Sequence, residues 1–296
     1  MNTSASSPSP LAPVSDLVLV TGAGGQTGSL VAAGLRERGV PVRAVARGTE
    51  PRFDWDDSGT WDPVLAGVTA VYLVTPLLPD FDAALVRDFL DRARAAGVRR
   101  LVLLSGASGE FGGVPILSRE QPLRAIDEDD LAWTVLRPNV FAQNFPAREP
   151  TLLADGGYRR PLGPAPGPRV AYVDVRDIAD VAVEILASAA PEHAGRTYYL
   201  DGPEALTSQE TLDLVGGRTG VPLTYREVSR QEWAKAARAA GVTPGWVEWG
   251  LAASAGQRRG EYAHLRDDIR RLLGREPRSL SAYLDEAVRA GAWRRN

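Results

Sequence analysis

A short apolar run, Leu17 to Thr21, leads directly into a glycine-rich segment, Gly22 to Gly28. The run is rich in β-branched residues, which is typical of a buried strand. The amphipathic stretch Gln26 to Arg38 follows, and Gly39 stands where a helix is expected to end. A strand that turns on glycines straight into a helix predicts the first unit of a parallel α/β sheet, and this limits the fold more than any other feature.

The spacing of the glycines indicates what such a turn binds. Gly22, Gly25 and Gly28 follow the pattern G-x-x-G-x-x-G. In this pattern the first glycine permits the tight turn, the second lets the backbone approach a pyrophosphate, and the third lets the helix pack on the strand. The start of the helix then offers N–H groups and partial positive charge to the phosphates. We therefore predict a dinucleotide site, with contacts from Thr21, Gly22, Gly24, Gly25, Gln26, Thr27 and Gly28.

The second strand, Val42 to Ala46, ends without the Asp or Glu that usually holds the ribose 2′-hydroxyl of NAD. Arg47 follows instead, and a guanidinium can pair with the 2′-phosphate of NADP(H). NADP(H) is therefore the expected cofactor and NAD(H) is less favoured, with a solvated surface arginine as the alternative for Arg47. Asp54 and Trp55 follow where the chain is expected to pass the adenine, with a turn and a packed Trp55 as the alternative.

Strand and helix patterns alternate along the chain beyond the second strand. We expect further strands at 68–74, 100–105, 131–136 and 197–200, and helices at 80–96, 121–129 and 177–187. This alternation predicts parallel β-α-β units. After about residue 202 helical patterns dominate, at 207–216, 230–240, 264–273 and 279–290, while the glycine- and proline-rich stretch Gly157 to Pro168 is predicted to be a loop.

The predicted fold class is α/β, a Rossmann-type doubly wound parallel sheet with a smaller, mostly helical C-terminal part that binds the substrate. Residues 15–156 form the dinucleotide-binding domain, with contributions from about 170–202, and residues 157–169 and 203–296 form the substrate-binding part. Residues 1–14 carry no charge and lack the apolar stretch of a signal peptide, so a disordered leader is expected there.

The composition excludes several kinds of chemistry. The 296 residues include no cysteine, and the two histidines, His193 and His264, lie far apart, so neither a metal site nor a histidine-based triad is expected. The net charge of −3 is unlike that of a nucleic-acid-binding protein. No run of about 18 apolar residues occurs that would span a membrane. We expect a cytoplasmic monomer or homodimer whose partner is a small-molecule substrate.

The motifs together resemble those of the NmrA-like, atypical short-chain dehydrogenase/reductase family. The likeness covers about residues 15–202 and rests on the glycine-rich segment, on Trp61–Val68 leading to Val71–Val74, on Trp133–Asn139 with Phe141 and Asn144, and on Tyr172–Ala179. The resemblance implies NAD(P)H as cofactor. The family includes quinone and imine reductases, ergot-alkaloid-type reductases and non-catalytic redox sensors.

The resemblance also implies roles for positions at the ends of strands, with packing as the alternative for each. Thr75 and Pro76 are expected beside the nicotinamide ribose. Ser105, Gly106 and Ala107 are expected under the nicotinamide. Pro138, Asn139 and Val140 are expected beside its carboxamide. Phe141 and Asn144 are expected in the substrate pocket. Trp246 and Trp249 are expected to add an aromatic wall, with helical packing against the core as the alternative.

The Tyr-x-x-x-Lys pair of ordinary short-chain dehydrogenases is missing. The chain has one lysine, Lys235, and Gln231 stands four residues before it. Arginine is a poor substitute as an acid or base, because its pKa is above about 12. The candidates for a proton donor are Ser105, Ser108, Glu120 and Tyr172, with packing or helix capping as the alternative for each.

These features predict an NADPH-dependent reductase that transfers a hydride to a quinone, an enone, or a cyclic imine or iminium, in specialised metabolism. Such acceptors need no strong enzyme acid, since an iminium already carries positive charge and an enone or quinone becomes a stabilised anion that water can protonate. Positioning alone can lower a barrier by about 7–11 kcal/mol. The alternatives are a non-catalytic NADP(H)-binding redox sensor and a non-redox isomerase or cyclase on the same fold.

Overall fold

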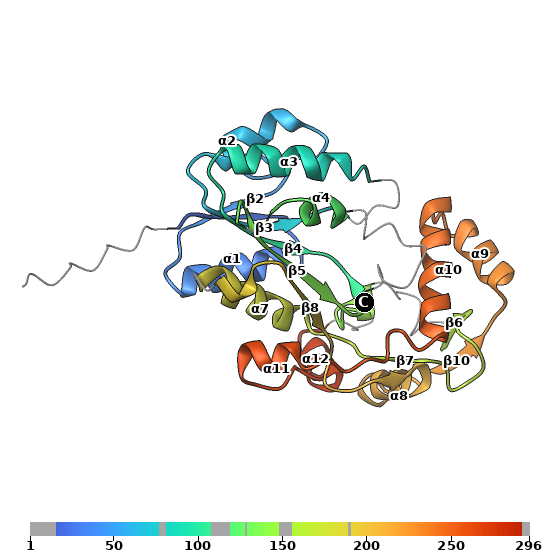
Figure 1. Ribbon diagram of the computed structural model, residues 1–296. Coiled ribbons are helices and arrows are strands. Elements are labelled where there is room, and N and C mark those ends of the chain that lie inside the picture. The colour runs from blue at the N-terminus through green and yellow to red at the C-terminus, as the bar shows by residue number, and fades with distance from the viewer. Residues whose placement is uncertain are drawn as a thin grey trace, which may run out of the picture.

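The computed structural model describes residues 16–76, 81–107, 119–127, 129–147, 156–188 and 191–291. The expected leader, 1–14, and the candidate proton donor Ser108 lie outside the described residues. Figure 1 shows a central sheet between two layers of helices, with further helices gathered beside one end of the sheet. In the described part of the chain, no helix has both the length and the apolar character needed to cross a membrane.

The central sheet has six strands in the order β2-β1-β3-β4-β5-β8, and all five pairings are parallel. The strands are β1 (Val18–Thr21), β2 (Val42–Val45), β3 (Ala70–Val74), β4 (Arg100–Leu104), β5 (Ala132–Pro138) and β8 (Arg196–Leu200). The order reverses between β1 and β3, because β2 lies on one side of β1 and all later strands lie on the other. Ligands of such sheets bind at the carboxyl ends of the strands beside this reversal. The topology confirms the predicted Rossmann-type fold.

Two layers of helices cover the sheet (Figure 1). The helices on one face are α1 (Gly28–Glu37) and α7 (Val175–Ala187), those on the other are α2 (Trp61–Leu65), α3 (Ala84–Ala95) and α4 (Gln121–Arg124), and two short turns of 3-10 helix are η1 (Ser58–Thr60) and η4 (Pro191–His193). The helix expected at 177–187 starts earlier, at Val175, because the Asp174 carboxylate accepts a hydrogen bond from the backbone N–H of Arg176 at 2.9 Å. The helix expected at 121–129 ends at Arg124.

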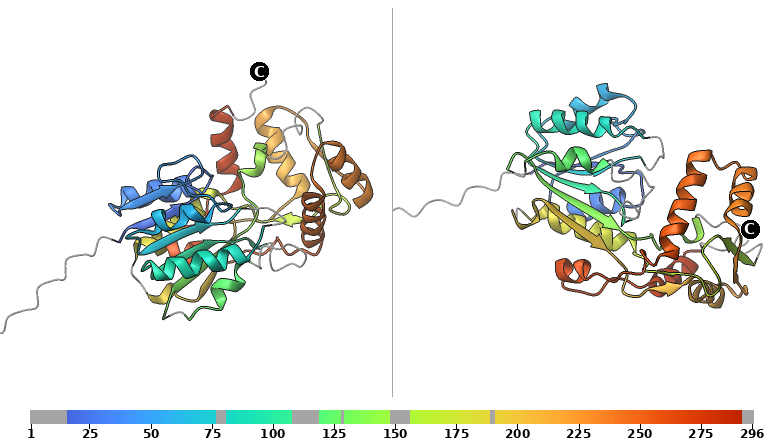
Figure 2. Two further views of the ribbon diagram at one scale, coloured as in Figure 1. Left: turned by 90° about the horizontal axis from the view of Figure 1, so that it is seen from above. Right: turned by 45° about the vertical axis from the view of Figure 1, so that its right-hand side comes forward.

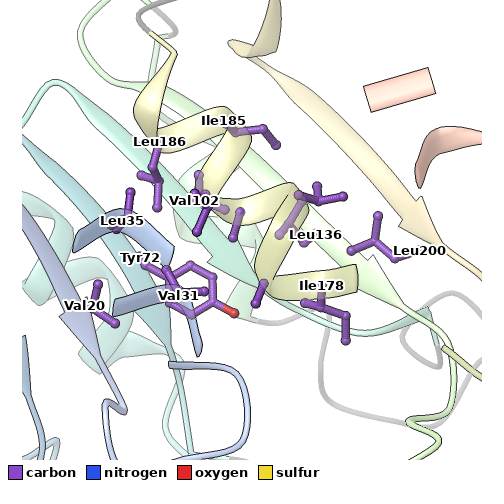
Figure 3. Close-up of a cluster of buried hydrophobic side chains, with 14 of the residues drawn as sticks. Val20, Val31, Leu35, Tyr72, Val102, Leu136, Ile178, Ile185, Leu186 and Leu200 are labelled. Atoms are coloured by element: carbon purple, nitrogen blue, oxygen red, sulfur yellow. The ribbon is translucent and has the colours of Figure 1, made fainter. Parts of the chain in front are cut away.

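Alternate residues of each strand face opposite helix layers, as the pleat of a strand requires. Val20 and Leu136 are buried with Ile178 of α7 in one cluster, which Figure 3 shows in close-up. Their neighbours in the strands, such as Leu19 and Val135, belong to a second cluster with α2 and α3. Because both faces of the inner strands are buried, β1, β3 and β4 are mainly apolar, which explains why their sequence pattern is easy to recognise.

The C-terminal part contains five helices and two small sheets in the residues that the structure describes. The helices are α8 (Ser208–Thr219), α9 (Arg230–Ala239), α10 (Pro244–Arg258), α11 (Asp268–Leu273) and α12 (Leu280–Arg289). The small sheets pair β6 (Gly157–Arg160) with β10 (Thr224–Glu227) in parallel, and β7 (Arg169–Val170) with β9 (Leu206–Thr207) antiparallel. Four of the five helices match expected ones.

Two features of this part differ from the sequence prediction. The prediction of a loop throughout Gly157 to Pro168 is wrong, because Gly157–Arg160 forms β6. Its partner β10 lies more than sixty residues further along, and a local pattern cannot reveal so distant a pairing. Helix α10 was also not expected. Its interior Gly250 allows α9 to pack closely, since a Cβ at this position would lie 2.5 Å from the Trp233 ring.

Buried polar contacts join the C-terminal part to the sheet layer. The fully buried carboxylate of Asp177, on α7, accepts hydrogen bonds from the Arg275 side chain at 2.7 Å and from the backbone N–H of Arg278 at 2.7 Å. Asp180, one turn later, pairs with the same two arginines at 2.5 and 2.9 Å. These contacts fix the segment between α11 and α12 against α7. The C-terminal helices therefore have a defined position beside the strand ends (Figure 2).

Candidate active site

The glycine-rich segment forms a tight loop between β1 and α1. Gly22 has a φ of +63°, which favours glycine, and its carbonyl accepts a hydrogen bond from the N–H of Gly25 at 2.8 Å. A Cβ at Gly28 would lie 2.3 Å from the Gly22 carbonyl oxygen, so a side chain there requires the loop to move. No side chain caps the start of α1, and Gly24, Gly25 and Gln26 are exposed. The loop thus fits a bound phosphate group, as the spacing predicts.

Two threonines predicted to contact the cofactor face the interior instead. The Thr21 hydroxyl is fully buried, donates a hydrogen bond to the Tyr72 carbonyl at 3.2 Å and accepts one from the Val74 N–H at 2.8 Å. Thr27 is 5% exposed. The Thr21 side chain therefore joins β1 to β3, and the open ligand-facing surface of this loop is mainly backbone.

Arg47 lies on the turn that follows β2. The turn is held by Thr49, whose hydroxyl accepts a hydrogen bond from the Ala46 N–H at 2.8 Å. The turn adjoins the glycine loop, because the Ala23 N–H bonds to the Val45 carbonyl at 3.1 Å. Arg47 is exposed, and among the described residues no ion pair or hydrogen bond involves its side chain. Its position and charge suit a 2′-phosphate, but a solvated arginine has the same exposure.

Asp54 and Trp55 take the packing role that was the alternative for them. The Trp55 indole N–H donates to the Val74 carbonyl at 3.1 Å, and its ring meets Phe53 and Phe81 edge-on, with centroids 5.4 Å away in both cases. Asp54 accepts a hydrogen bond from Arg52 at 2.5 Å. At 8% exposure Trp55 offers little surface to an adenine, so the structure argues against the predicted contact. Thr75 and Pro76 directly follow β3, at the carboxyl edge of the sheet.

A cavity of about 210 Å³ opens at the carboxyl ends of β4 and β5. From the sheet side it is lined by Ser105, Gly106, Pro138, Asn139, Val140 and Phe141, and by Asn144 and Phe145 of the short helix α5 (Asn144–Ala147). From the C-terminal part it is lined by Tyr158, Arg160, Ser208, Trp249, Gly250, Ala253, Ser254, Gln257 and Tyr262, with Tyr172 between the two sides. The cavity brings together most of the residues predicted at the nicotinamide end and in the substrate pocket. Ala107 is buried and is not among the lining residues.

Ser105 and Glu120 form a hydrogen-bonded pair at the base of the cavity. The Ser105 hydroxyl donates to Glu120 Oε1 at 2.5 Å. Arg137 holds both oxygens of Glu120, from Nε at 2.9 Å and Nη2 at 2.6 Å, and Arg124 adds a hydrogen bond at 2.9 Å. Burial raises the pKa of Glu120, but the hydrogen bonds from Arg137, Ser105 and Arg124 outweigh it and hold the pKa below its ordinary value.

This arrangement argues against two of the proposed proton donors. Glu120, 1% exposed, is an ionised carboxylate between arginines, so it has no proton to give and does not line the cavity. The Ser105 hydroxyl directs its hydrogen bond to Glu120, which leaves oxygen lone pairs for the cavity. Tyr172 remains a candidate by position, since it lines the cavity and its ring contacts Phe145 with centroids 5.6 Å apart.

Asn139 and Trp246 also have structural roles. Asn139 Nδ2 donates to Asp201 at 2.8 Å and to the Tyr262 carbonyl at 3.1 Å, so its side chain fixes the C-terminal chain to the end of β5. Trp246 does not line the cavity but meets Trp249 edge-on, with ring centroids 5.3 Å apart. The predicted aromatic wall is therefore Trp249, supported by Trp246.

Several lining residues escaped sequence reasoning, although the sequence contains a signal for them. Tyr158 and Arg160 are two residues apart, which places both on one face of β6. Trp249, Ala253 and Gln257 are four residues apart, which places them on one face of α10. The two-residue spacing has meaning only if residues 157–160 form a strand, and the four-residue spacing only if residues 244–258 form a helix. Neither element was predicted from the sequence. In the described part of the chain, no cluster of three or more His, Asp or Glu side chains is suited to a metal ion.

Comparisons with known proteins place this site in a family. The family model described as NAD(P)H-binding matches residues 22–189. A (4-alkanoyl-5-oxo-2,5-dihydrofuran-3-yl)methyl phosphate reductase of Streptomyces griseus is 34% identical over 292 residues, which is 93% of this chain and 99% of the relative. An uncharacterized oxidoreductase of Bacillus subtilis, YesF, is 29% identical over 93% of this chain and 96% of its own.

Solved structures share the fold. The structure of an NADPH-dependent quinone oxidoreductase of Escherichia coli, QOR2, superimposes with a TM-score of 0.80 at 21% identity, over 92% of this chain and 99% of that one. The glycine loop, the parallel sheet and the cavity at the strand ends agree with these matches. The chain therefore belongs to the NAD(P)H-binding, NmrA-like family of atypical short-chain dehydrogenases/reductases, and it is an NAD(P)H-dependent oxidoreductase.

Proposed function

We propose that this protein is an NADPH-dependent reductase that delivers a hydride to a carbon–carbon double bond conjugated with a carbonyl group. The cavity is the observation that carries the proposal. It opens where the nicotinamide is expected, beside Ser105, Gly106 and Pro138, and it has aromatic walls, among them Phe141 and Trp249. Such walls suit a flat, weakly polar acceptor and exclude water from the transfer.

Among the residues that the structure describes, no strong acid lines the cavity, and this supports an acceptor that needs none. Glu120 is ionised and Ser105 donates to it, while the single lysine, Lys235, is exposed on α9 and does not line the cavity. A hydride added to a conjugated double bond leaves an enolate, in which the carbonyl oxygen carries the charge. Water or the Tyr172 hydroxyl protonates this stabilised anion, so no Tyr-Lys pair is required.

The relatives support the same chemical class. The substrate named for the Streptomyces griseus reductase contains a ring double bond conjugated with a ring carbonyl and an alkanoyl group. The Escherichia coli protein is named as a quinone oxidoreductase, and a quinone is also a conjugated dicarbonyl. The shared chemistry favours a conjugated carbonyl compound over an imine or iminium as the acceptor.

The residues around the cofactor have separate tasks in this proposal. Bound NADPH supplies the hydride. The backbone of the glycine loop and the start of α1 hold its pyrophosphate, and Arg47 pairs with the 2′-phosphate. Ser105, whose hydroxyl donates its hydrogen bond to Glu120, accepts a hydrogen bond at the nicotinamide end of the cavity. The C-terminal side of the cavity then holds the acceptor against the nicotinamide, and this positioning supplies most of the rate gain.

The test is NADPH oxidation against a panel of enones, butenolides, quinones and cyclic imines, with cofactor binding titrated in parallel. We expect turnover with the enones or butenolides and none with the imines. Turnover with imines alone would replace the proposed acceptor class. Tight NADPH binding with no turnover across the panel would favour a redox sensor instead.

A further inference from the structure

Arg160 is the one charged residue among those that line the cavity, within the part of the chain that the structure describes. The other lining side chains are aromatic, aliphatic, hydroxyl or amide groups, and none is a carboxylate. A cation on an otherwise uncharged wall attracts an anionic group of a ligand more strongly than it would in water, since the surrounding medium screens less. The charge of this cavity therefore bears on which substrates enter it.

The guanidinium of Arg160 is oriented by its neighbours. It lies over the Tyr158 ring, 5.5 Å from the centroid, and over the Trp233 ring, 5.3 Å from the centroid. Its Nε donates a hydrogen bond to the Tyr158 hydroxyl at 3.2 Å. Stacking uses the faces of the planar group, whereas its N–H donors point outward in the plane. The two rings and the Tyr158 hydroxyl therefore hold the guanidinium at this part of the cavity wall.

The backbone beneath Arg160 is also fixed. β6 pairs with β10, where Arg160 lies opposite Glu227. The buried Tyr225 hydroxyl, on β10, donates to the Gly163 carbonyl at 2.5 Å and to the Arg160 carbonyl at 3.4 Å. An arginine on a paired strand loses less freedom on binding than one on a loop, which favours a specific contact.

The position of β6 separates this charge from the cofactor. β4 and β5 point toward the side of the molecule on which β6 and α10 lie, as Figures 1 and 2 show. Ser105 and Pro138, at the strand ends, and Arg160, on β6, thus line the cavity from different elements on different sides. A substrate that spans the cavity meets the nicotinamide at one end and the arginine at the other.

We propose that Arg160 binds an oxyanion group, a phosphate or a carboxylate, on the part of the substrate that lies away from the carbon that accepts the hydride. The inference rests on the proposed function and names the substrate class more closely, as an acidic conjugated carbonyl compound. A planar guanidinium matches a phosphate or carboxylate with two parallel hydrogen bonds. Arg160 acts here on specificity and not on the chemical step.

The experiment compares two butenolides with their neutral counterparts. One carries a methylphosphate arm and the other a carboxylate. Each is paired with its uncharged ester, which is the dimethyl ester of the phosphate and the methyl ester of the carboxylate. We expect the wild-type kcat/KM to be about 10- to 100-fold higher for the acids than for the esters, from one charge-assisted hydrogen bond. The ratio of kcat/KM for an acid to that for its ester is compared between the two arms, and the arm with the larger ratio shows whether the site prefers a phosphate or a carboxylate.

Variants assign the preference to this residue. Arg160→Met keeps an unbranched apolar stem and removes the guanidinium, so the acid-to-ester ratio should fall to about one. Arg160→Lys should retain part of it, because an ammonium lacks the bidentate geometry. Arg159→Met is the matched control, since Arg159 is the exposed neighbour that does not line the cavity, and its ratio should equal that of the wild type. An acid preference that persists in Arg160→Met overturns the proposal.

A binding measurement separates this proposal from the reductase assignment. The saturated lactone with the methylphosphate arm is titrated calorimetrically into the NADP⁺-bound protein, where no turnover is needed. Binding that is lost in Arg160→Met but kept in Arg159→Met supports the oxyanion site even if no butenolide is reduced. Equal binding of the acid and its ester to the wild type contradicts it. NADPH affinity should match the wild type in Arg160→Met, and cooperative thermal unfolding of this variant excludes misfolding as the cause.

Discussion

The cofactor end and the substrate end of the candidate site are built in different ways. At the cofactor end, the ligand-facing surface is mainly backbone: the loop from Gly22 to Gly28, with Arg47 as the nearby charged side chain. At the substrate end the surface is side chains, including Tyr158, Arg160 and Trp249, from elements far apart in the sequence. A backbone surface suits a cofactor shared by many enzymes, whereas side chains can change from one enzyme to the next without altering the fold.

Between the two ends stands the Glu120 network, which we interpret as structural. We expect Glu120→Gln to lower the free energy of unfolding by about 3–5 kcal/mol, because it leaves Arg137 buried without its carboxylate partner. Chemical denaturation measures this, with the exposed Glu37→Gln as the control. If Glu120→Gln kept its stability and lost turnover, Glu120 would be a catalytic residue and the structural interpretation of this network would be wrong.

The backbone character of the cofactor end is tested at Gly28. We expect Gly28→Ala to cost about 1–3 kcal/mol of stability and to weaken NADPH binding strongly, because the added Cβ would lie 2.3 Å from the Gly22 carbonyl oxygen. Thermal unfolding and an NADPH titration measure the two effects. At Gly217, in α8, a Cβ meets no atom within 4 Å, so Gly217→Ala should bind NADPH as the wild type does and should not lose stability, since alanine favours a helix. Unchanged cofactor binding in Gly28→Ala would show that the loop is not the phosphate site.

Arg47 is the one side chain that we expect to matter for the identity of the cofactor. Arg47→Ala should weaken NADPH binding by about 10- to 100-fold and leave NADH binding nearly unchanged, since only NADPH carries the 2′-phosphate. Parallel titrations of both cofactors measure this. Arg36→Ala, on the exposed side of α1, controls for general loss of positive charge. Equal weakening of both cofactors would refute the contact.

The side-chain character of the substrate end is tested at Trp249. We expect Trp249→Ala to raise the KM for the enone or butenolide by about tenfold, from lost apolar contact, and to leave NADPH affinity unchanged. Steady-state kinetics separate the two. Trp246→Ala, which removes a supporting ring outside the cavity, should have a smaller effect on KM. If Trp249→Ala changed NADPH affinity and left the KM for the substrate unchanged, Trp249 would belong to the cofactor end and not to the substrate end.

The smallest expected effect is on the pH dependence of stability. The pKa of Glu120 lies below its ordinary value of 4.5, so its contribution is complete at neutral pH and is lost as the pH falls through the folded-state pKa. Glu120→Gln should therefore flatten the acid side of the stability curve. The flattening is partial, because Asp174 also has a lowered pKa and acts in the same direction. If the free energy of unfolding of Glu120→Gln fell with decreasing pH as steeply as that of the wild type, the stabilising role of ionised Glu120 would be contradicted.

The same contrast explains what the sequence could and could not predict. The strands, the glycine loop and the helix start follow from patterns within some ten to twenty residues, and the structure confirms them. β6 depends on β10, and the wall of α10 depends on how α9 packs against Gly250, so both lie beyond local patterns. Arg160 was missed for that reason.

Burial explains the site residues that took other roles. Glu120, Asn139 and Trp55 carry groups that suit catalysis or ligand binding, and their types alone give no indication of exposure. Their hydrogen bonds to Arg137, Asp201 and Val74 occupy them. Asp201 is distant from Asn139 in the sequence. Arg137 and Val74 lie within twenty residues of their partners, but on strands β5 and β3, which a local pattern does not bring next to Glu120 and Trp55.

The most direct test of the central claim is to follow the hydride itself. NADPH deuterated at the nicotinamide C4 position is incubated with the protein and a butenolide, and the product is examined by NMR. The account predicts one deuterium at the carbon β to the carbonyl, with the proton at the α carbon drawn from solvent. Deuterium at any other carbon, or no product from a protein saturated with NADPH, would contradict a conjugated reductase at this cleft.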